Sequence, residues 1–401
     1  MSHAPLVLTG AALSFDDVLS VARDDRRVKL GPEALAAVHG ARNMVESAAC
    51  GADPVYGLNT GFGSLSRHCV EPHQTSEIQR NLLRSHAAGV GPLLDREVVR
   101  GMLILLAASL SRGHSGVRPL VIEQILNLLN HDLTPSVPCR GSVGASGDLA
   151  PLAHAALVLI GEGDVVNSDG SCMDGGEALG GAGLQPISLE AKEGLALING
   201  THLMAAILSI LCADADRLLP AAIVAGAMSL DAARGSAGPF DARIHAARCQ
   251  TGQQIVAKRL RALLDGSDIL TSHQVDDPRV QDPYCLRCMP QVMGAAWDAM
   301  ASVRGVVQNE LGAVTDNPLI FADDSAIVSG GNFHGMPLAI AADHAAIALC
   351  HIAGIAERRI FWLLSGHDSE NPVPLYLSSN PGLHSGLMIV QYTAAALVNE
   401  M

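Results

Sequence analysis

Long stretches with the apolar periodicity of an α-helix fill the chain after Pro186, and they constrain its fold more than any other feature. Ala and Leu, both strong helix formers, dominate the 49% of residues that are hydrophobic, whereas aromatic residues, which favour strands, make up 3%. The stretches are long for globular helices and lack the charge pattern of a coiled coil, so they predict a bundle of long, buried helices. They cover residues 189–214, 218–233, 251–264, 289–313, 336–366 and 384–401.

The first half of the chain mixes shorter patterns. An extended LVLTG precedes a helix start at Ser14, and helical periodicity then runs from Glu77 to Leu129. Glycine and proline interrupt this periodicity near residues 89–92 and 113–116. The Gly-rich, polar segment from Asp164 to Gly183 predicts a surface excursion or a hairpin.

These patterns predict two domains in a mainly α protein. We expect a smaller, mixed N-terminal domain over residues 1–195 and a long-helix domain over residues 196–401. The final run, residues 386–401, stops without a glycine cap or a basic last turn. We therefore expect the natural helix to continue, and the bundle to be incomplete at its C-terminal end.

Charge, hydropathy and cysteine usage exclude several classes of function. Lys and Arg number 26 and Asp and Glu number 40, and the resulting charge of −14 argues against a nucleic-acid partner. The start has no signal-peptide pattern, and the longest apolar stretches, 203–211 and 218–228, are interrupted before the roughly 18 residues of a membrane span. The nine cysteines suggest no disulfide framework, and the CxxC pair Cys285 and Cys288 has no second pair at zinc spacing. We expect a cytoplasmic protein without a membrane or metal site.

Four loops rich in glycine and polar residues are candidates for chemistry, because function concentrates on loops held by a rigid scaffold. The first, YGLNTGFG over residues 56–63, places Tyr56 among three glycines. A phenol acts as a general base if its pKa falls from about 10 toward the working pH. A packed loop tyrosine is the simpler alternative, and a phosphate loop is disfavoured because GK[ST] is absent.

The second loop is GSVGASGDLAPLAH, residues 141–154. It does not fit a nucleophile elbow, because Asp148 stands where GxSxG requires glycine. If the backbone is pressed together, the Gly147 nitrogen can bond to the Ala145 carbonyl carbon, an approach that a side chain would block. Loss of one water, and then of the Ser146 hydroxyl as a second, would leave a methylidene electrophile. An ordinary Ala-Ser-Gly turn is the simpler alternative.

The third and fourth loops carry charged and amide side chains. In QDPYCLRCMPQ, residues 281–291, Tyr284 and Arg287 are three apart and share a face of a helical turn. The planar guanidinium suits a carboxylate ligand, although a structural pairing of Arg287 with Asp282 is the alternative. The fourth candidate combines TDNP, residues 315–318, with GGNFHG, residues 330–335. These residues favour either simple turns or the polar lining of a pocket.

Together these segments resemble the aromatic amino-acid ammonia-lyases, the methylidene-imidazolone enzymes. YGLNTGFG, GSVGASGDLAPLAH, LINGT, QDPYCLRC, TDNP and GGNFH occur in the order of that family, from Tyr56 onward. The resemblance implies a mainly helical fold of the fumarase/aspartase type, a homotetramer, and active sites built from several subunits. It also implies that Ala145, Ser146 and Gly147 cyclise autocatalytically to 4-methylidene-imidazol-5-one, without an external cofactor.

The resemblance further implies a role for individual positions. Tyr56 matches the base that removes the β-proton, and Asn199 matches the residue that supports the cofactor and the substrate amine. Tyr284 and Arg287 match the pair at the leaving amine and the carboxylate, and Asp148 matches the acid beside the cyclising tripeptide. Pocket residues of the family match Gln281, Asn317 and Phe333.

The substrate expected from the resemblance is L-histidine, which would give trans-urocanate. His86 follows Ser85, a pair that histidine-selective members carry, and its ring can hydrogen-bond an imidazole or a phenol. Three departures keep tyrosine ammonia-lyase and aminomutase open as alternatives: His202 in place of the usual Gln, HGMP at residues 334–337 in place of an Ala-Glu pattern, and a tyrosine-type NPGLH at residues 380–384. An acidic residue that contacts imidazole in histidine lyases lies C-terminal to the last segment here. An inactive homologue that serves only as an oligomeric scaffold is the alternative from another class.

Overall fold

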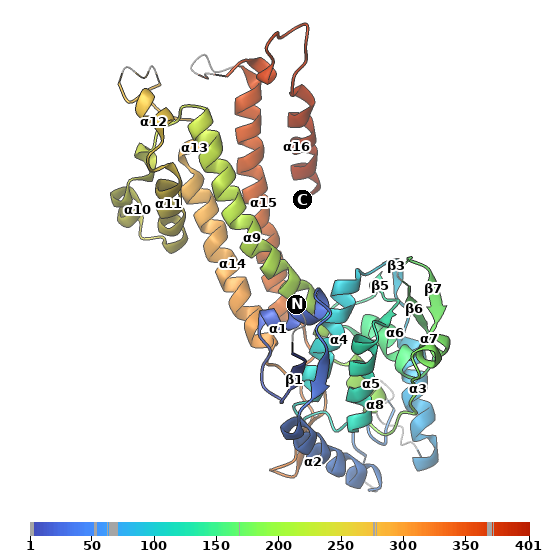
Figure 1. The fold of residues 1–401 in the computed structure, drawn as a ribbon. Coiled ribbons are helices and arrows are strands. Elements are labelled where there is room, and N and C mark those ends of the chain that lie inside the picture. The colour runs from blue at the N-terminus through green and yellow to red at the C-terminus, as the bar shows by residue number, and fades with distance from the viewer. Residues whose placement is uncertain are drawn as a thin grey trace. The chain divides into compact units, whose positions relative to one another are not determined.

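A computed structural model describes residues 4–51, 54–61, 63, 71–167, 169–275, 277, 279–366, 371 and 373–401. The fold is mainly α, as predicted, and the chain forms two compact units (Figure 1). Unit 1 contains residues 1–211 and 306–339, and unit 2 contains residues 212–305 and 340–401. The chain passes between the units inside three long helices, which are α9 (His202–Ala232), α14 (Met289–Glu310) and α15 (Met336–Ser365). The domain boundary predicted after residue 195 stays a prediction.

Unit 1 is built around helix α4 (Arg96–Leu110), which is buried from Val99 to Leu110. Helices α1 (Phe15–Ala22) and α5 (Pro119–Asn130) pack against it. The predicted helix start at Ser14 is confirmed, since Ser14 Oγ accepts from the Asp17 amide and the Asp17 carboxylate accepts from the Ser14 amide, both at 3.1 Å. The other helical elements of unit 1 are α2 (Pro32–Ala49), η2 (Pro72–Gln74), α3 (Thr75–His86), α6 (Leu149–Leu159), α7 (Gly175–Gly181) and α8 (Glu193–Ile198).

Four small sheets complete unit 1. The hairpin of β6 (Asp164–Val166) and β7 (Cys172–Asp174) confirms the excursion expected over residues 164–183. Strand β6 also pairs antiparallel with β4 (Thr134–Pro135). The antiparallel pair of β3 (Val90–Leu93) and β5 (Pro138–Arg140) brings the segment after α3 beside the segment that leads into Ala145. The remaining pairs are β1 (Leu6–Leu8) with β2 (Val28–Leu30), parallel, and β8 (Leu319–Phe321) with β9 (Ala326–Val328), antiparallel.

Unit 2 is the predicted bundle of long helices. Its parts of α9, α14 and α15 lie side by side (Figure 1), and Gly226, Met289 and Arg359 mark the point where the three meet. A side chain at Gly226 would collide with the Met289 sulfur, so glycine permits this close approach. Helix α16 (Met388–Glu400) lies next to α15, where Gln391 donates to Glu357 at 3.0 Å. The shorter elements are η3 (Gly238–Phe240), α10 (Ala242–Arg248), α11 (Thr251–Leu264), α12 (Asp268–Ser272), α13 (Tyr284–Arg287) and η4 (Leu375–Leu377).

Two predicted helix boundaries were wrong. The stretch predicted over 189–214 is divided, because α8 ends before Asn199 and α9 begins only at His202. The break predicted between 214 and 218 does not occur, since α9 continues through Pro220. An interior proline costs roughly 3 kcal/mol. Burial of apolar neighbours such as Leu219 and Ile223 offsets that cost.

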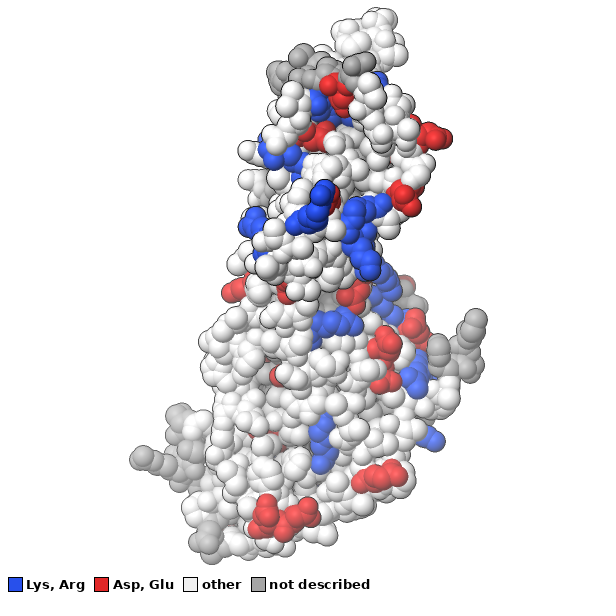
Figure 2. Space-filling view, turned by 90° about the vertical axis from the view of Figure 1, so that its left-hand side faces the viewer, with Lys and Arg blue, Asp and Glu red and all other residues white. Residues whose placement is uncertain are grey.

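Two helical stretches are long and apolar enough to cross a membrane by length and composition alone, namely residues 193–232 and 336–365. Their most apolar windows are 83% and 33% buried within the protein, respectively. The first stretch, which contains α8 and α9, is therefore mostly part of the core, whereas the second carries much exposed apolar surface. Charged side chains are sparse on the face shown in Figure 2, where the two signs are interspersed between wide uncharged areas.

Candidate active site

The Ala145-Ser146-Gly147 turn joins β5 to α6 and projects from unit 1. Ala145 and Ser146 are exposed, whereas Gly147 is buried against the backbone of Gly200. Gly147 has φ +73°, and a Cβ at this position would lie 2.7 Å from the Gly200 carbonyl carbon. Only glycine satisfies both conditions. The next amide, that of Asp148, donates to the Gly200 oxygen at 2.7 Å and fixes this packing.

The fully buried carboxylate of Asp148 holds the turn in place. Asp148 Oδ2 accepts from the amides of Leu203 and Met204 at the start of α9, at 2.9 and 3.1 Å, and Oδ1 accepts from Ser142 Oγ at 2.9 Å. Burial raises the pKa of Asp148 to about 6, although the three hydrogen bonds oppose the shift. The side chain thereby ties the tripeptide to the first turn of α9.

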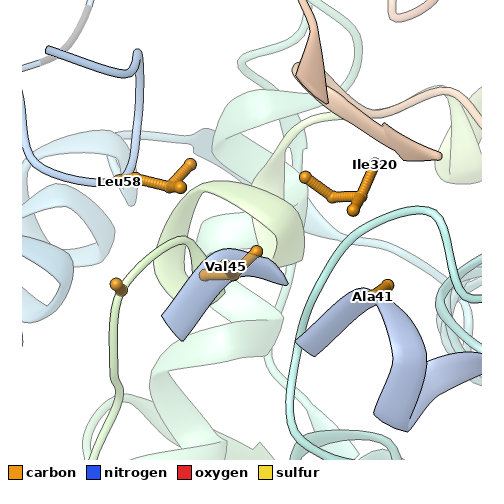
Figure 3. Close-up of a cluster of buried hydrophobic side chains, with 5 residues drawn as sticks. Ala41, Val45, Leu58 and Ile320 are labelled. Atoms are coloured by element: carbon orange, nitrogen blue, oxygen red, sulfur yellow. The ribbon is translucent and has the colours of Figure 1, made fainter. Parts of the chain in front are cut away.

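Tyr56 stands in a loop that is anchored by its apolar neighbours. Leu58 packs with Ala41 and Val45 of α2 and with Ile320 of β8, as Figure 3 shows. The half-buried Tyr56 accepts a hydrogen bond at its hydroxyl from the Gly63 amide at 3.2 Å. Phe62 of the same segment lies outside the described residues.

Asn199 and Asn317 meet in a buried polar network. Asn199 Nδ2 donates to the Asn317 carbonyl oxygen at 3.3 Å and to Asp316 Oδ1 at 3.5 Å. Asp316 also pairs with Lys192, whose Nζ lies 2.5 Å from Oδ2. The Asn317 side chain accepts from the Gly330 amide at 2.7 Å. Both predicted site residues are thus fixed by hydrogen bonds rather than by local turn geometry.

The loop with Phe333 and the end of helix α3 both reach the tripeptide segment. The Gly335 amide donates to the Gly144 oxygen at 2.8 Å, which places the loop of the half-buried Phe333 beside the turn. A Cβ at Gly141 would lie 3.1 Å from the Gly89 Cα, so the segment after α3 packs against the start of the motif.

His86, the last residue of α3, is half-buried and has a defined tautomer. Its Nδ1 lies 2.9 Å from the Leu82 carbonyl oxygen and 3.0 Å from Ser85 Oγ. Because a carbonyl only accepts, Nδ1 carries the hydrogen, and Nε2 of the neutral ring is left as an acceptor. The imidazole therefore offers a lone pair to a donor on a ligand.

Gln281, Tyr284 and Arg287 belong to unit 2. Tyr284 is exposed, and the Arg287 guanidinium lies over its ring at 4.4 Å from the centroid, so the predicted shared face is confirmed. The alternative of a structural pairing between Arg287 and Asp282 holds for the backbone only: Arg287 Nε donates to the Asp282 backbone oxygen at 2.9 Å, whereas Arg279 pairs with the Asp282 carboxylate at 2.8 Å. Gln281 is exposed beside them.

The structure brings one set of predicted residues together within unit 1. Backbone and side-chain contacts within unit 1 link the tripeptide to Asn199, to Asn317 and to the loop of Phe333. Sequence reasoning missed Lys192, because a lysine in the segment Glu190-Ala-Lys-Glu193 is typical of an exposed turn. Among the described residues, no three His, Cys, Asp or Glu side chains are grouped as a metal site.

Known proteins match nearly the whole chain. A family model described as aromatic amino acid lyase matches residues 13–401. A histidine ammonia-lyase of Symbiobacterium thermophilum is 50% identical over 391 residues, which are 98% of this chain and 76% of the relative.

Solved structures agree with the sequence match. The crystal structure of histidine ammonia-lyase from Trypanosoma cruzi is 39% identical with a TM-score of 0.88, covering 99% of this chain and 74% of that one. A tyrosine aminomutase from Streptomyces globisporus is 37% identical with a TM-score of 0.91, covering 99% and 78%. The fold is thus shared with these two enzymes over almost the whole chain.

Proposed function

The chain belongs to the aromatic amino acid lyase family, and we propose that it is a carbon–nitrogen lyase that converts L-histidine to trans-urocanate and ammonia. Identities near 50% to histidine ammonia-lyases favour histidine over other aromatic amino acids. The observation that carries the proposal is the Ala145-Ser146-Gly147 turn, which presents Ser146 at the surface while Gly147 packs against Gly200.

The tripeptide fits the methylidene-imidazolone group that the family uses. Formation requires the Gly147 nitrogen to bond to the Ala145 carbonyl carbon, with loss of that oxygen as water and of the Ser146 hydroxyl as a second water. The absent side chain at Gly147 leaves room for this approach, and Asp148 and Ser142 hold the flanking backbone. Once formed, the group supplies an electrophile that turns the substrate amine into a better leaving group.

The remaining roles fall to ordinary side chains. Tyr56 removes the β-proton, a weak acid that a positioned phenolate can accept. Asn199 supports the substrate amine, and Tyr284 assists its departure. Arg287 binds the carboxylate in ground and transition states alike, so it positions the substrate more than it accelerates the reaction. Gln281, Asn317 and Phe333 line the pocket.

Histidine selectivity is assigned to His86. Its free Nε2 accepts from the N–H of a substrate imidazole, because Nδ1 is committed to the Leu82 carbonyl. An apolar residue at this position would leave a buried substrate nitrogen unpaired, which costs about 1–3 kcal/mol.

The working form is proposed to be a cytoplasmic homotetramer. Helices α15 and α16 expose large apolar side chains, among them Ile347 (61%) and Ile389 (62%). Apolar faces of this kind favour burial against further copies of the chain. Gln281, Tyr284 and Arg287 would then join the unit 1 residues within the oligomer, as the family resemblance implies.

A substrate comparison tests the proposal. The chain is incubated separately with L-histidine, L-tyrosine and L-phenylalanine, and the ultraviolet band of each enoate is followed. We expect the highest kcat/KM for histidine. A higher value for tyrosine would replace histidine as the substrate, and accumulation of a β-amino acid would indicate an aminomutase. No turnover together with a mass that has not lost two waters would indicate an inactive scaffold.

A further inference from the structure

The buried ion pair of Lys192 and Asp316 contacts Asn199 of the candidate site and has no part in the chemistry described so far. Lys192 Nζ and Asp316 Oδ2 are 2.5 Å apart, and their side chains are 0% and 3% exposed. Burial lowers the pKa of Lys192, and Asp316 opposes the shift. Apolar residues of the same size often stabilise a fold as well as a buried pair does, so stability alone is weak evidence for why this pair is present.

The acidic partner holds the side chain of Asn199. Asp316 Oδ1 and the Asn317 carbonyl oxygen both face the Asn199 amide group, at 3.5 and 3.3 Å. Both atoms only accept, so the NH2 end of the Asn199 amide is the end that faces them. The carbonyl oxygen of that amide is thereby turned away from the ion pair. Asp316 Oδ1 also accepts from the Asn317 amide at 2.6 Å.

The basic partner reaches the loop that carries Tyr56. A Cβ at Gly57 would lie 3.9 Å from Lys192 Cδ and would collide with Leu195 of α8. Lys192 itself has φ +75°, a conformation that non-glycine residues rarely adopt. The aliphatic stem of Lys192 therefore packs beneath the residue after Tyr56, while its ammonium group pairs with Asp316. One pair thus connects the segments of Tyr56, Asn199 and Asn317.

We propose that Lys192 and Asp316 are positioning residues that fix the Asn199 amide, so that its carbonyl oxygen accepts from the amine of the bound amino acid. Lys192 holds the Asp316 carboxylate in place, and Asp316 holds the NH2 group of Asn199. Neither residue contacts the substrate. This inference rests on the proposed lyase function, because it assigns the pair to the amine end of that substrate.

Two matched double variants separate positioning from stability. Lys192→Met/Asp316→Asn and Lys192→Met/Asp316→Leu both remove the charges and keep similar side-chain volumes. The first retains an oxygen that can accept from Asn199, and the second does not. We expect kcat/KM for histidine to be about tenfold or more higher in the first variant. The leucine variant also leaves the Asn317 amide without its acceptor, so it should unfold at a lower temperature, and both variants are assayed well below that temperature. Equal kcat/KM in the two folded variants would overturn the proposal.

A double-mutant cycle covers the case in which the leucine variant does not fold. Lys192→Met/Asp316→Ala, which removes the acceptor for Asn199, is compared with the unsubstituted pair in the natural chain and in an Asn199→Ala background. We expect the loss of kcat/KM in the natural chain to shrink below about threefold when Asn199 is absent, because positioning acts through that residue. If the pair substitution lowers kcat/KM by the same factor with and without Asn199, the proposal is contradicted.

Binding gives a readout without turnover. In a Ser146→Ala background, calorimetry measures the Kd of L-histidine with and without the two double substitutions, and we expect the leucine version to bind more weakly than the asparagine version. An equal Kd would contradict a contact to the substrate amine. The wild-type chain in the activity assay keeps the two hypotheses apart: if it forms no urocanate, the proposed function fails, whatever the variants do.

Discussion

The backbone of Gly147 lies directly against that of Gly200, and this contact connects the Ala145-Ser146-Gly147 turn to the segment between α8 and α9. The Asp148 amide donates to the Gly200 oxygen at 2.7 Å, which leaves no space for a side chain on Gly147. The contact explains why the tripeptide ends in glycine, and it places the turn beside Asn199, the residue before Gly200.

Gly147→Ala is expected to prevent cofactor formation, because its Cβ would lie 2.7 Å from the Gly200 carbonyl carbon. Intact mass is the measurement, since a matured chain has lost two waters. Gly183→Ala is the matched control: Gly183 has the same φ of +73° but nothing within 4 Å of the added Cβ. A matured Gly147→Ala chain, or an unmatured Gly183→Ala chain, would contradict this explanation.

Ser146→Ala is expected to remove the methylidene and most of the activity, because the hydroxyl that leaves as the second water is absent. Urocanate formation and intact mass are measured together. Ser171→Ala, in an exposed turn between β6 and β7, should leave both unchanged. Full activity in the Ser146→Ala chain would contradict the assignment of Ala145-Ser146-Gly147 as the cofactor precursor.

Tyr56→Phe is expected to lower kcat by about 10²–10⁴, the usual effect of removing a general base. The fold should survive, because the substitution removes only a hydroxyl that accepts from the Gly63 amide. Tyr392→Phe on α16, where the ring is exposed, serves as the control. A decrease of less than about threefold at Tyr56 would count against its role.

His86→Leu is expected to lower kcat/KM for histidine by roughly 5- to 150-fold, since an unpaired imidazole nitrogen costs about 1–3 kcal/mol. Phenylalanine has no ring nitrogen, so its kcat/KM should not fall by the same factor. Parallel assays of the two substrates check this. Equal losses for both would assign His86 a structural role instead.

His202→Gln is expected to change the response of stability to acid. Burial lowers the pKa of His202 to about 3, and within the described chain neither ring nitrogen has a hydrogen-bond partner. The unfolded imidazole takes up a proton below about pH 6.5 and the folded one does not, so folding stability is lost as the pH falls.

Relative to this variant, the free energy of unfolding of the wild type should fall by about 1.4 kcal/mol per pH unit below pH 6.5. Urea unfolding of both proteins at pH 7 and pH 5 measures the difference. The raised pKa of Asp148 increases folding stability as the pH falls, which is the opposite effect. Because Asp148 is present in both proteins, its contribution cancels in the comparison. Identical pH dependence in the two would show that His202 is protonated, or accessible to protons, in the folded state.

The helical class was predictable because its signals are local. Apolar periodicity predicted α11 over residues 251–264 and α14 and α15 to within a few residues, and Ser14 marked the start of α1. The tripeptide and Tyr56 became candidates through neighbouring residues and the family resemblance, without knowledge of the packing, and their roles stay predictions.

Only the tertiary structure decided which partners the polar residues take. Asp282 pairs with Arg279 rather than Arg287, and Lys192, which stands between two glutamates in the sequence, is fully buried against Asp316. Helix α9 continues through Pro220 because burial of its neighbours outweighs the missing hydrogen bond. Burial and ion pairing depend on segments far apart in the chain, so a local pattern determines which helices form, whereas the packing of distant segments determines which charges they enclose.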